Sequence, residues 1–227
     1  MEKSSFLRNK YWVLRHGKSI PNEKGLIVSS LEHGILSEYQ LAPEGVNQAQ
    51  LAGISFLKEL KEDNVPLESV RICYSPFSRT THTAKVVASM LNVPFEGPQC
   101  KVLEELRERF FGPSFELQSH DMYTEIWALD EKDPFIGPEG GESAADVVSR
   151  LAVAIDSLEK EFQGCVILIV SHGDPLQILQ IVLHAANQQN GPDGGDVVLK
   201  LEAVKVPSIL SQHRKFALQT GELRPIL

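Results

Sequence analysis

Arg15 and His16 are the first residues in the chain whose types and spacing could do chemistry. They follow the apolar residues 11–14, which predict a buried strand, and Gly17 permits a sharp turn after them. A guanidinium can hold a phosphate in a planar fork, and an imidazole can attack or transfer a proton near neutral pH. The pair therefore indicates chemistry on an anion, although a solvated strand end would also account for these two residues alone.

An arginine or a histidine also follows each of two further predicted strands. Residues 70–74 lead into Ser75-Pro76-Phe77-Ser78-Arg79, and the apolar residues 166–170 lead into Ser171-His172-Gly173. The carboxyl ends of parallel strands meet at one edge of a sheet, where open α/β folds bind their ligands. We therefore expect one crevice to collect two guanidiniums and two imidazoles, those of Arg15, His16, Arg79 and His172.

Helical patterns separate these strands. Pro43 and Glu44 suit the first turn of a helix that continues to about residue 60, and Ser78 is a candidate cap for the helix after the second strand. Further helices are predicted over 142–162 and from Pro175 onward. The alternation predicts a three-layer α/β/α sandwich with a mostly parallel central sheet. Residues 197–206 alternate in character and are predicted to add one more strand.

The composition is that of an ordinary globular protein. The 227 residues are 42% hydrophobic and 23% charged, and without an internal repeat or linker we expect a single domain over residues 1–227. A net charge of −8 argues against nucleic acid and anionic membranes as partners. Residues 1–10 are too polar for a signal peptide, and three cysteines without a C-x-x-C pair indicate no disulfide framework. We expect a cytoplasmic protein, and the oligomeric state stays open.

Two irregular stretches should provide the contacts to a substrate. Residues 23–40 are polar, and residues 112–141 carry seven acidic residues and one lysine, a net charge of −6 without any arginine. Tyr123, Ile126, Trp127 and Leu129 predict a short amphipathic helix in the second stretch, which we call the excursion.

Five motifs in order resemble the histidine phosphatase superfamily, and within it the phosphoglycerate-mutase-like branch. They are Leu14-Arg15-His16-Gly17 with a downstream Asn22, the run 75–84, Leu106-Arg107-Glu108-Arg109-Phe110-Phe111-Gly112, Gly140-Gly141-Glu142-Ser143 and Val170-Ser171-His172-Gly173. The resemblance extends from about Tyr11 to Leu183. Each motif is short, but the series is specific in its order and in the elements on which the motifs lie.

The resemblance implies a role for each motif residue. His16 would be the nucleophile that accepts the phosphoryl group, and Glu108 would protonate the leaving oxygen. Arg15, Arg79 and His172 would hold the phosphate, and Asn22 and Gly173 would contribute to substrate binding. Fixed cations stabilise the charge that phosphoryl transfer spreads over the equatorial oxygens, so neither a metal nor another cofactor is required. The predicted activity is hydrolysis of small phosphorylated metabolites through a phosphohistidine at His16.

Two alternatives use the same scaffold. A phosphoglycerate mutase must hold a second anion, and the excursion offers no arginine for it. Lys18 and Pro21 also stand where the resemblance leads us to expect Glu and Trp in mutases. The second alternative is a non-catalytic protein that binds phosphorylated ligands, although binding alone does not need the acid Glu108.

Two other mechanisms involve the same region. A metallohydrolase could use His16, His172 and Glu108 as ligands, but two neighbouring arginines would repel the metal. Cys73 to Thr80 fits C-x5-R-[ST], the spacing of cysteine-dependent phosphatases, yet the loop lacks glycine and Cys73 lies within an apolar strand. Glu105 is the alternative acid. Surface or core positions are predicted for the remaining histidines, His33, His82, His120, His184 and His213.

Overall fold

The computed structural model describes residues 5–189 and 196–226. Within these residues, five strands form one sheet in the order β3-β2-β4-β1-β5. The strands are β1 (Lys10–Arg15), β2 (Val70–Tyr74), β3 (Cys100–Val102), β4 (Val166–Ser171) and β5 (Leu223–Ile226). All neighbours pair in parallel except β5, which runs antiparallel to β1 at the edge. The predicted mostly parallel sheet is confirmed.

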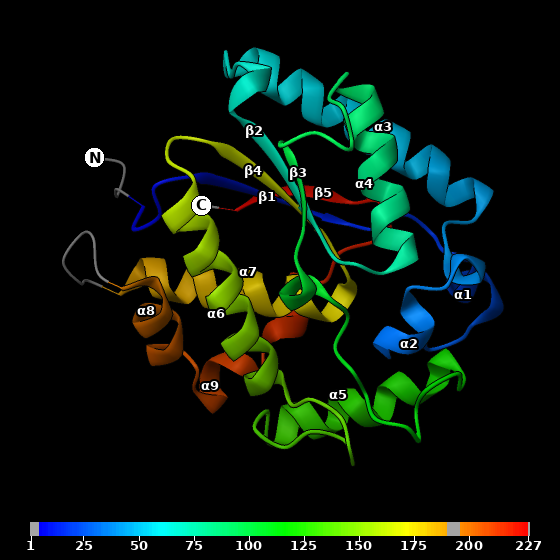
Figure 1. Cartoon of the computed structure of the whole chain (residues 1–227). Helices are drawn as coiled ribbons and strands as arrows, with labels where there is room; N and C mark the ends of the chain where they lie inside the picture. Colours follow the sequence, from blue (N-terminus) through cyan, green and yellow to red (C-terminus); the bar gives the residue numbers. More distant parts are fainter. Residues whose placement is uncertain (1–4, 190–195, 227) are drawn as a thin grey trace.

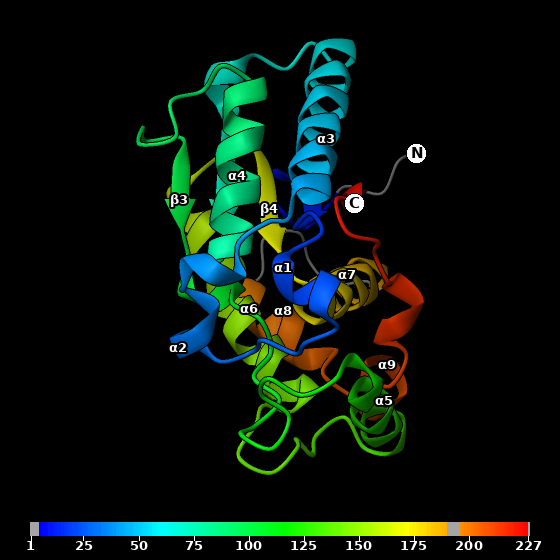
Figure 2. The same ribbon diagram turned by 90° about the vertical axis from the view of Figure 1, so that its right-hand side faces the viewer.

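Helices cover both faces of the sheet (Figures 1 and 2). On one face lie α3 (Pro43–Glu62) and α4 (Ser78–Met90), packed on side chains such as Leu14, Ile72 and Leu168. On the other face lie α6 (Ala144–Glu161) and α7 (Gly173–Gln188), packed on Val13 and Ile169. Successive residues of a strand point to opposite faces, so β4 must be apolar throughout to serve both layers. The α/β/α sandwich is therefore the observed architecture.

Shorter elements lie between and after these layers. They are α1 (Ile20–Lys24), α2 (Leu31–Gly34), α5 (Tyr123–Lys132), α8 (Val197–Ala203) and α9 (Pro207–Leu210). The predicted amphipathic helix of the excursion is α5. Ile27 exchanges backbone hydrogen bonds with Leu117 and Gln118, and its side chain packs with Phe111 and Ile126. These contacts fasten the excursion to the loop between α1 and α2.

Three local predictions were wrong or incomplete. Residues 197–206 form the helix α8 and a following turn, not a strand. The side chain of Asp196 caps the helix by accepting from the Leu199 N–H, and Val197 and Leu201 are buried at helical spacing. Phe77, not Ser78, is the N-cap residue of α4, and no side chain caps that helix. The edge strands β3 and β5 were missed because three or four residues are too short for a periodic signal.

Candidate active site

The three predicted strand ends meet at one edge of the sheet. Arg15, at the end of β1, lies opposite Ser171 of β4, and β2 pairs with β4 in the same parallel sense. The rings of His16 and His172 lie with their centroids 5.2 Å apart. Arg79, in the first turn of α4, places its Nε 3.1 Å from His16 Nε2. The four side chains that the sequence predicted to converge are therefore neighbours.

His16 is buried as a neutral imidazole whose Nε2 lone pair accepts a hydrogen bond from Arg79 Nε. Its Nδ1 lies 2.8 Å from the carbonyl oxygen of Gly17, so Nδ1–H donates to that oxygen and Nε2 is the basic nitrogen. Burial, followed by the positive charges of Arg79 and Arg15, holds the pKa of His16 well below its usual 6.5. A ring in this state can attack an electrophile through Nε2 without first losing a proton.

His172 is fully buried beside it and is oriented by a serine. The Ser75 hydroxyl lies 2.8 Å from His172 Nε2, and Nδ1 faces the Glu108 carboxylate at 3.7 Å. Burial, with Arg79 as the next cause, lowers the pKa of His172 well below 6.5. With the hydroxyl donating to Nε2, the neutral ring carries its proton on Nδ1 and directs that donor toward the site.

Three buried nitrogen atoms of this cluster have no hydrogen-bond partner within the described residues. They are Arg15 Nε, Arg79 Nη1 and His172 Nδ1, one from each strand end. Three other arginine donors are bonded: Arg15 Nη1 donates to Leu218 O at 2.7 Å, Arg79 Nη2 to Val28 O at 2.9 Å, and Arg79 Nε to His16 Nε2 at 3.1 Å. Buried donors are normally satisfied, so three of them around one point fit an oxyanion.

Glu108 is the carboxylate nearest to this cluster. Its Oε2 lies 3.7 Å from Arg79 Nη2, and the backbone N–H of Arg109 donates to its Oε1 at 3.0 Å. Burial raises the pKa of Glu108 to about 7, against the opposing charge of Arg79, and Asp174 adds to the rise. A carboxyl that titrates near neutrality can carry a proton to a leaving group. Glu105, the alternative acid, does not line the cavities at this site.

Asn22 and Gly173 border the cluster from two helix starts. The Asn22 side-chain oxygen accepts from the backbone and hydroxyl of Ser19 in the capping box of α1, which leaves its amide NH₂ for another acceptor. Gly173 begins α7, whose N-terminal dipole favours an anion. A Cβ on Gly173 would lie 3.6 Å from Arg15 Cζ, so Gly173 lies directly beside that guanidinium.

A second glycine allows the chain to leave β1 toward α1. A Cβ on Gly17 would lie 2.2 Å from the carbonyl oxygen of Gly45, and a Cβ on Gly45 would lie 2.0 Å from that of Lys18. The backbone after His16 therefore packs directly on the first turn of α3. This contact fixes the position from which the His16 ring enters the site. The sequence predicted a turn at Gly17 but not its partner Gly45.

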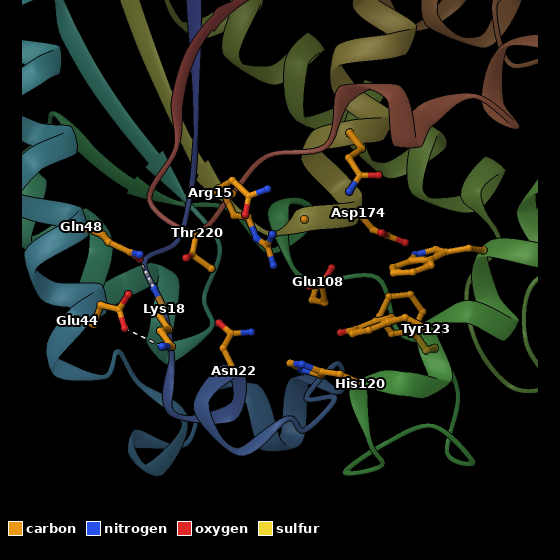
Figure 3. Close-up of a pocket in the computed structure, with 15 residues that line it drawn as sticks. Arg15, Lys18, Asn22, Glu44, Gln48, Glu108, His120, Tyr123, Asp174 and Thr220 are labelled. Carbon is orange, nitrogen blue, oxygen red and sulfur yellow. Dashed lines mark hydrogen bonds and ion pairs between the residues drawn. The ribbon is translucent and has the colours of Figure 1, made fainter.

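Two adjoining cavities lead to the cluster. A small inner one of about 20 Å³ reaches His16 and Arg79, and we call it the phosphate pocket. An outer cavity of about 670 Å³ opens beside it (Figure 3). The residues that border both are Arg15, Asn22, Glu108, His120 and Tyr123. An ester oxygen passing from one cavity to the other would lie among these five side chains.

The outer cavity differs from the sequence prediction. The excursion contributes His120, Tyr123 and Trp127, but no residue of 23–40 lines the outer cavity. Other lining residues come from the loop after β1, from the start of α3 and from the C-terminal segment, and they were not predicted: Lys18, Glu44, Gln48, Gln219 and Thr220. His120, for which a surface or core position was predicted, is half-buried and lines both cavities. The rule that parallel strands end at one edge of the sheet could place residues at the site from sequence alone. It says nothing about residues at helix starts or in the C-terminal segment.

The acidic residues of the excursion do not line the outer cavity. Glu116 accepts hydrogen bonds from Ser29, Ser30 and His33 and so ties the excursion to the α2 region. Asp130 forms a bidentate pair with Arg109, at 2.6 and 2.9 Å. The excursion's charge of −6 is therefore not the charge that a ligand would meet.

Cys73 does not have the environment of a nucleophile. It is fully buried in β2, and burial raises the pKa of its thiol to about 12. A thiol with this pKa stays protonated at neutral pH and unreactive. Over residues 5–189 and 196–226, no group of three or more His, Cys, Asp or Glu side chains could hold a metal ion. None of the helices in those ranges is long and apolar enough to cross a membrane.

This chain belongs to the histidine phosphatase superfamily, because the model of that superfamily's branch 1 matches residues 11–195. The family assignment from the five motifs is confirmed. Among curated proteins, the chain is 25% identical over 200 residues to a probable phosphoglycerate mutase of Arthroderma benhamiae, covering 84% of this chain and 51% of that protein. It is 25% identical over 228 residues to a fructose-2,6-bisphosphatase of Saccharomyces cerevisiae, covering 93% and 45%. The chain thus spans about half the length of these two relatives.

Solved structures share the fold. A mycobacterial glucosyl-3-phosphoglycerate phosphatase superposes with a TM-score of 0.64 at 19% identity, over 96% of this chain and 90% of that one. A phosphoserine phosphatase from Entamoeba histolytica superposes with a TM-score of 0.63 at 19% identity, over 96% and 94%. The relatives include proteins named as phosphatases and as mutases, and they act on small phosphorylated metabolites.

Proposed function

We propose that this protein is a phosphomonoesterase that works through a phosphohistidine at His16 and needs neither a metal nor another cofactor. The observation that carries the proposal is the state of His16, a neutral ring whose basic Nε2 lies beside three unpartnered buried donors. A non-catalytic binding protein would need those donors but not a nucleophile and a proton donor on either side of them. The proposal also includes a single domain and a cytoplasmic location, as expected from the sequence.

The positions of the side chains support the following steps. The donors Arg15 Nε, Arg79 Nη1 and His172 Nδ1 hold the phosphoryl oxygens as His16 Nε2 forms its bond to phosphorus. The P–O bond to the leaving group breaks, and the proton of Glu108 passes to the departing oxygen. The carboxylate then takes a proton from water, which attacks phosphorus and releases inorganic phosphate and the free ring. Fixed donors supply the charge stabilisation for both steps.

Hydrolysis is favoured over mutase activity by the charges around the outer cavity. A mutase must keep the dephosphorylated intermediate bound by its second anion. Arg109, which follows Glu108 in the chain, is fully buried against Asp130 and Asp174 and does not line that cavity. Lys18 is paired with Glu44 at 2.7 Å. The parts of the site beyond the phosphate pocket therefore favour release of the dephosphorylated product.

The test is to trap the intermediate. Purified protein is mixed with nitrophenyl phosphate in the presence of a chelator, release of phosphate is measured, and the reaction is quenched in acid or in alkali. We expect turnover in the chelator and a phosphoenzyme that survives alkali but not acid, located on His16 by mass spectrometry. Phosphate release that disappears with the chelator, or a phosphoenzyme stable in acid, would contradict the proposal.

A further inference from the structure

The outer cavity has two walls of different chemistry. Tyr123 and Trp127 of α5 form an aromatic wall, with rings nearly parallel at 10° and centroids 5.9 Å apart. Across the cavity lie polar side chains from the start of α3 and from the C-terminal segment, among them Gln48 and Thr220 (Figure 3). A leaving group that extends from the phosphate pocket would touch both walls.

The polar wall offers little to a second anion. The Lys18 ammonium is bound by Glu44 at 2.7 Å, and Asp174 presents another carboxylate, held from behind by the buried Arg109. Burial, as the largest cause, lowers the pKa of His120, so that ring is neutral. Of the cations that line the outer cavity, Lys18 is paired with Glu44, and Arg15 also borders the phosphate pocket, where the phosphoryl group would take its charge. A carboxylate or second phosphate would therefore lose its water for little gain, which makes its binding costly.

The aromatic wall is equally unsuited to a cation. Arg214 Cζ lies 3.5 Å from the centre of the Trp127 ring and already occupies one face of the aromatic pair. An ammonium group on the leaving group would be repelled by this guanidinium and by Arg15 at the border of the phosphate pocket. The lining carboxylates Glu44 and Asp174 are already paired with Lys18 and Arg109, so neither is left for a cation. Both signs of charge are therefore disfavoured, and the cavity suits an uncharged leaving group.

Neutral donors in fixed orientations are available to such a group. Gln48 Oε1 accepts from the backbone N–H of Lys18 at 2.8 Å, which sets the orientation of its amide and leaves the NH₂ for a ligand. Asn22 is oriented in the same way by Ser19. Amide donors and the Thr220 hydroxyl match the oxygens of hydroxyl groups, and aromatic faces match the apolar C–H faces of a ring or chain. The cavity volume of about 670 Å³ is typical of a small-molecule site.

We propose that the substrates are monophosphates of sugars or polyols, whose uncharged hydroxylated skeleton lies between Tyr123 and Trp127 on one side and Gln48 and Thr220 on the other. This inference rests on the proposed phosphatase function and names the class of leaving group. The reaction is the hydrolysis already described, with the proton of Glu108 passing to the alcohol oxygen of the sugar or polyol.

A matched pair of substrates tests the charge of the leaving group. Glycerol 3-phosphate and 3-phosphoglycerate have the same size and differ in a CH₂OH or a carboxylate. We expect kcat/KM to be at least tenfold higher for glycerol 3-phosphate, and higher again for glucose 6-phosphate, which reaches the aromatic wall. A ratio of one or below, or faster release of phosphate from adenosine monophosphate than from glucose 6-phosphate, would overturn the inference. Nitrophenyl phosphate separates the two proposals, because loss of activity on it as well would contradict the phosphatase function itself.

A pair of variants tests whether the Lys18–Glu44 pair sets this preference. Glu44→Gln releases the Lys18 ammonium toward the cavity, so the preference for glycerol 3-phosphate should fall about fivefold, as expected for one partly exposed charge pair. Glu62→Gln is the control, because Glu62 forms a similar exposed pair with Lys58 at the far end of α3. An unchanged ratio in Glu44→Gln, or an equal fall in Glu62→Gln, would contradict the role assigned to the charges of the cavity.

Discussion

The phosphate pocket and the outer cavity adjoin each other but are built differently. The pocket lies against the cluster at three parallel strand ends, whose histidines are almost completely buried, and residues from 19–28, Glu108 and the excursion complete its lining. The outer cavity is lined by loop residues, helix starts and the C-terminal segment, and several of its side chains are half-exposed. Under the proposed function, the first region would hold the phosphoryl group in fixed geometry, and the second would meet a variable leaving group through mostly neutral side chains.

Because of this difference, we expect the phosphate pocket to determine the rate of phosphoryl transfer and the outer cavity to determine which substrates are preferred. Substitutions in the phosphate pocket should reduce turnover of every substrate, because each substrate carries the same phosphoryl group. Substitutions in the outer cavity should change the ratio between substrates. The predictions below test this division, beginning with the largest effect.

His16→Ala should reduce turnover of all phosphomonoesters by about 10⁴-fold or more, because it removes the nucleophile of the proposed mechanism. Steady-state release of phosphate from nitrophenyl phosphate measures the loss. Cys73→Ser is the control and should stay near the parent rate, since that thiol is buried and protonated. An inactive Cys73→Ser protein that retains the native fold by circular dichroism would instead favour the cysteine mechanism.

Glu108→Gln should separate substrates by the basicity of their leaving group. We expect a loss of about 10²- to 10³-fold with an alkyl phosphate and a much smaller loss with nitrophenyl phosphate, whose leaving group needs no proton. Glu105→Gln is the matched control, because this neighbouring acid does not line either cavity. Equal losses on both substrates in Glu108→Gln would show that Glu108 is not the acid.

The carboxyl group of Glu108 should also limit activity at high pH. Because burial raises the pKa of Glu108 to about 7, the acid form is present below that pH and is lost as the pH rises through it. For alkyl phosphates, kcat/KM of the parent protein should therefore fall above about pH 7. This limb of the pH profile should be absent in Glu108→Gln, and its persistence there would assign it to another group.

A smaller effect is expected when the rate of isomerisation is compared with the rate of hydrolysis. With 3-phosphoglycerate and a 2,3-bisphosphoglycerate primer, formation of 2-phosphoglycerate should be at least tenfold slower than release of inorganic phosphate. The physical reason is the paired state of Lys18 and the burial of Arg109, which leave the second anion without a partner. Phosphorus NMR follows both products at once. Isomerisation faster than hydrolysis would identify a mutase.

The comparison of the two regions also explains what could be predicted from sequence. Strand segments such as 166–170 carry a strong apolar signal, and the parallel-strand rule then brings Arg15 and His172 together without knowledge of any loop. The alternation of side chains along each strand then predicts which residues face each helical layer. These local and topological rules account for the sandwich and for the phosphate pocket.

No comparable rule positions the outer cavity. Thr220 reaches it because β5 pairs antiparallel with β1, and the four residues of that strand gave no pattern in the sequence. His120 lines it because the backbone of residues 117–119 pairs with the loop after α1. The same limitation produced the false strand at 197–206, where apolar residues at helical spacing also fit an alternating pattern.

The smallest expected effect is that of Ser75, which lies just behind the phosphate pocket. Ser75→Ala removes the hydroxyl that orients His172 through Nε2, so the ring loses its fixed tautomer and kcat/KM should fall about tenfold on every substrate. Ser78→Ala is the matched control, three residues along the chain: its Oγ is also buried but has no hydrogen-bond partner among the described residues. Removing that hydroxyl should leave activity unchanged.

The ratio between substrates distinguishes this effect from one on the outer cavity. Ser75→Ala should lower kcat/KM for glycerol 3-phosphate and for nitrophenyl phosphate by the same factor, because in the proposed mechanism His172 holds the phosphoryl group that both share. The melting temperature of each variant shows whether lost activity reflects lost structure. A tenfold loss confined to one substrate would mean that Ser75 acts on the leaving group, and the two regions would then not be separable. An equal loss in Ser78→Ala would mean that the start of α4, rather than the hydrogen bond to His172, supports the site.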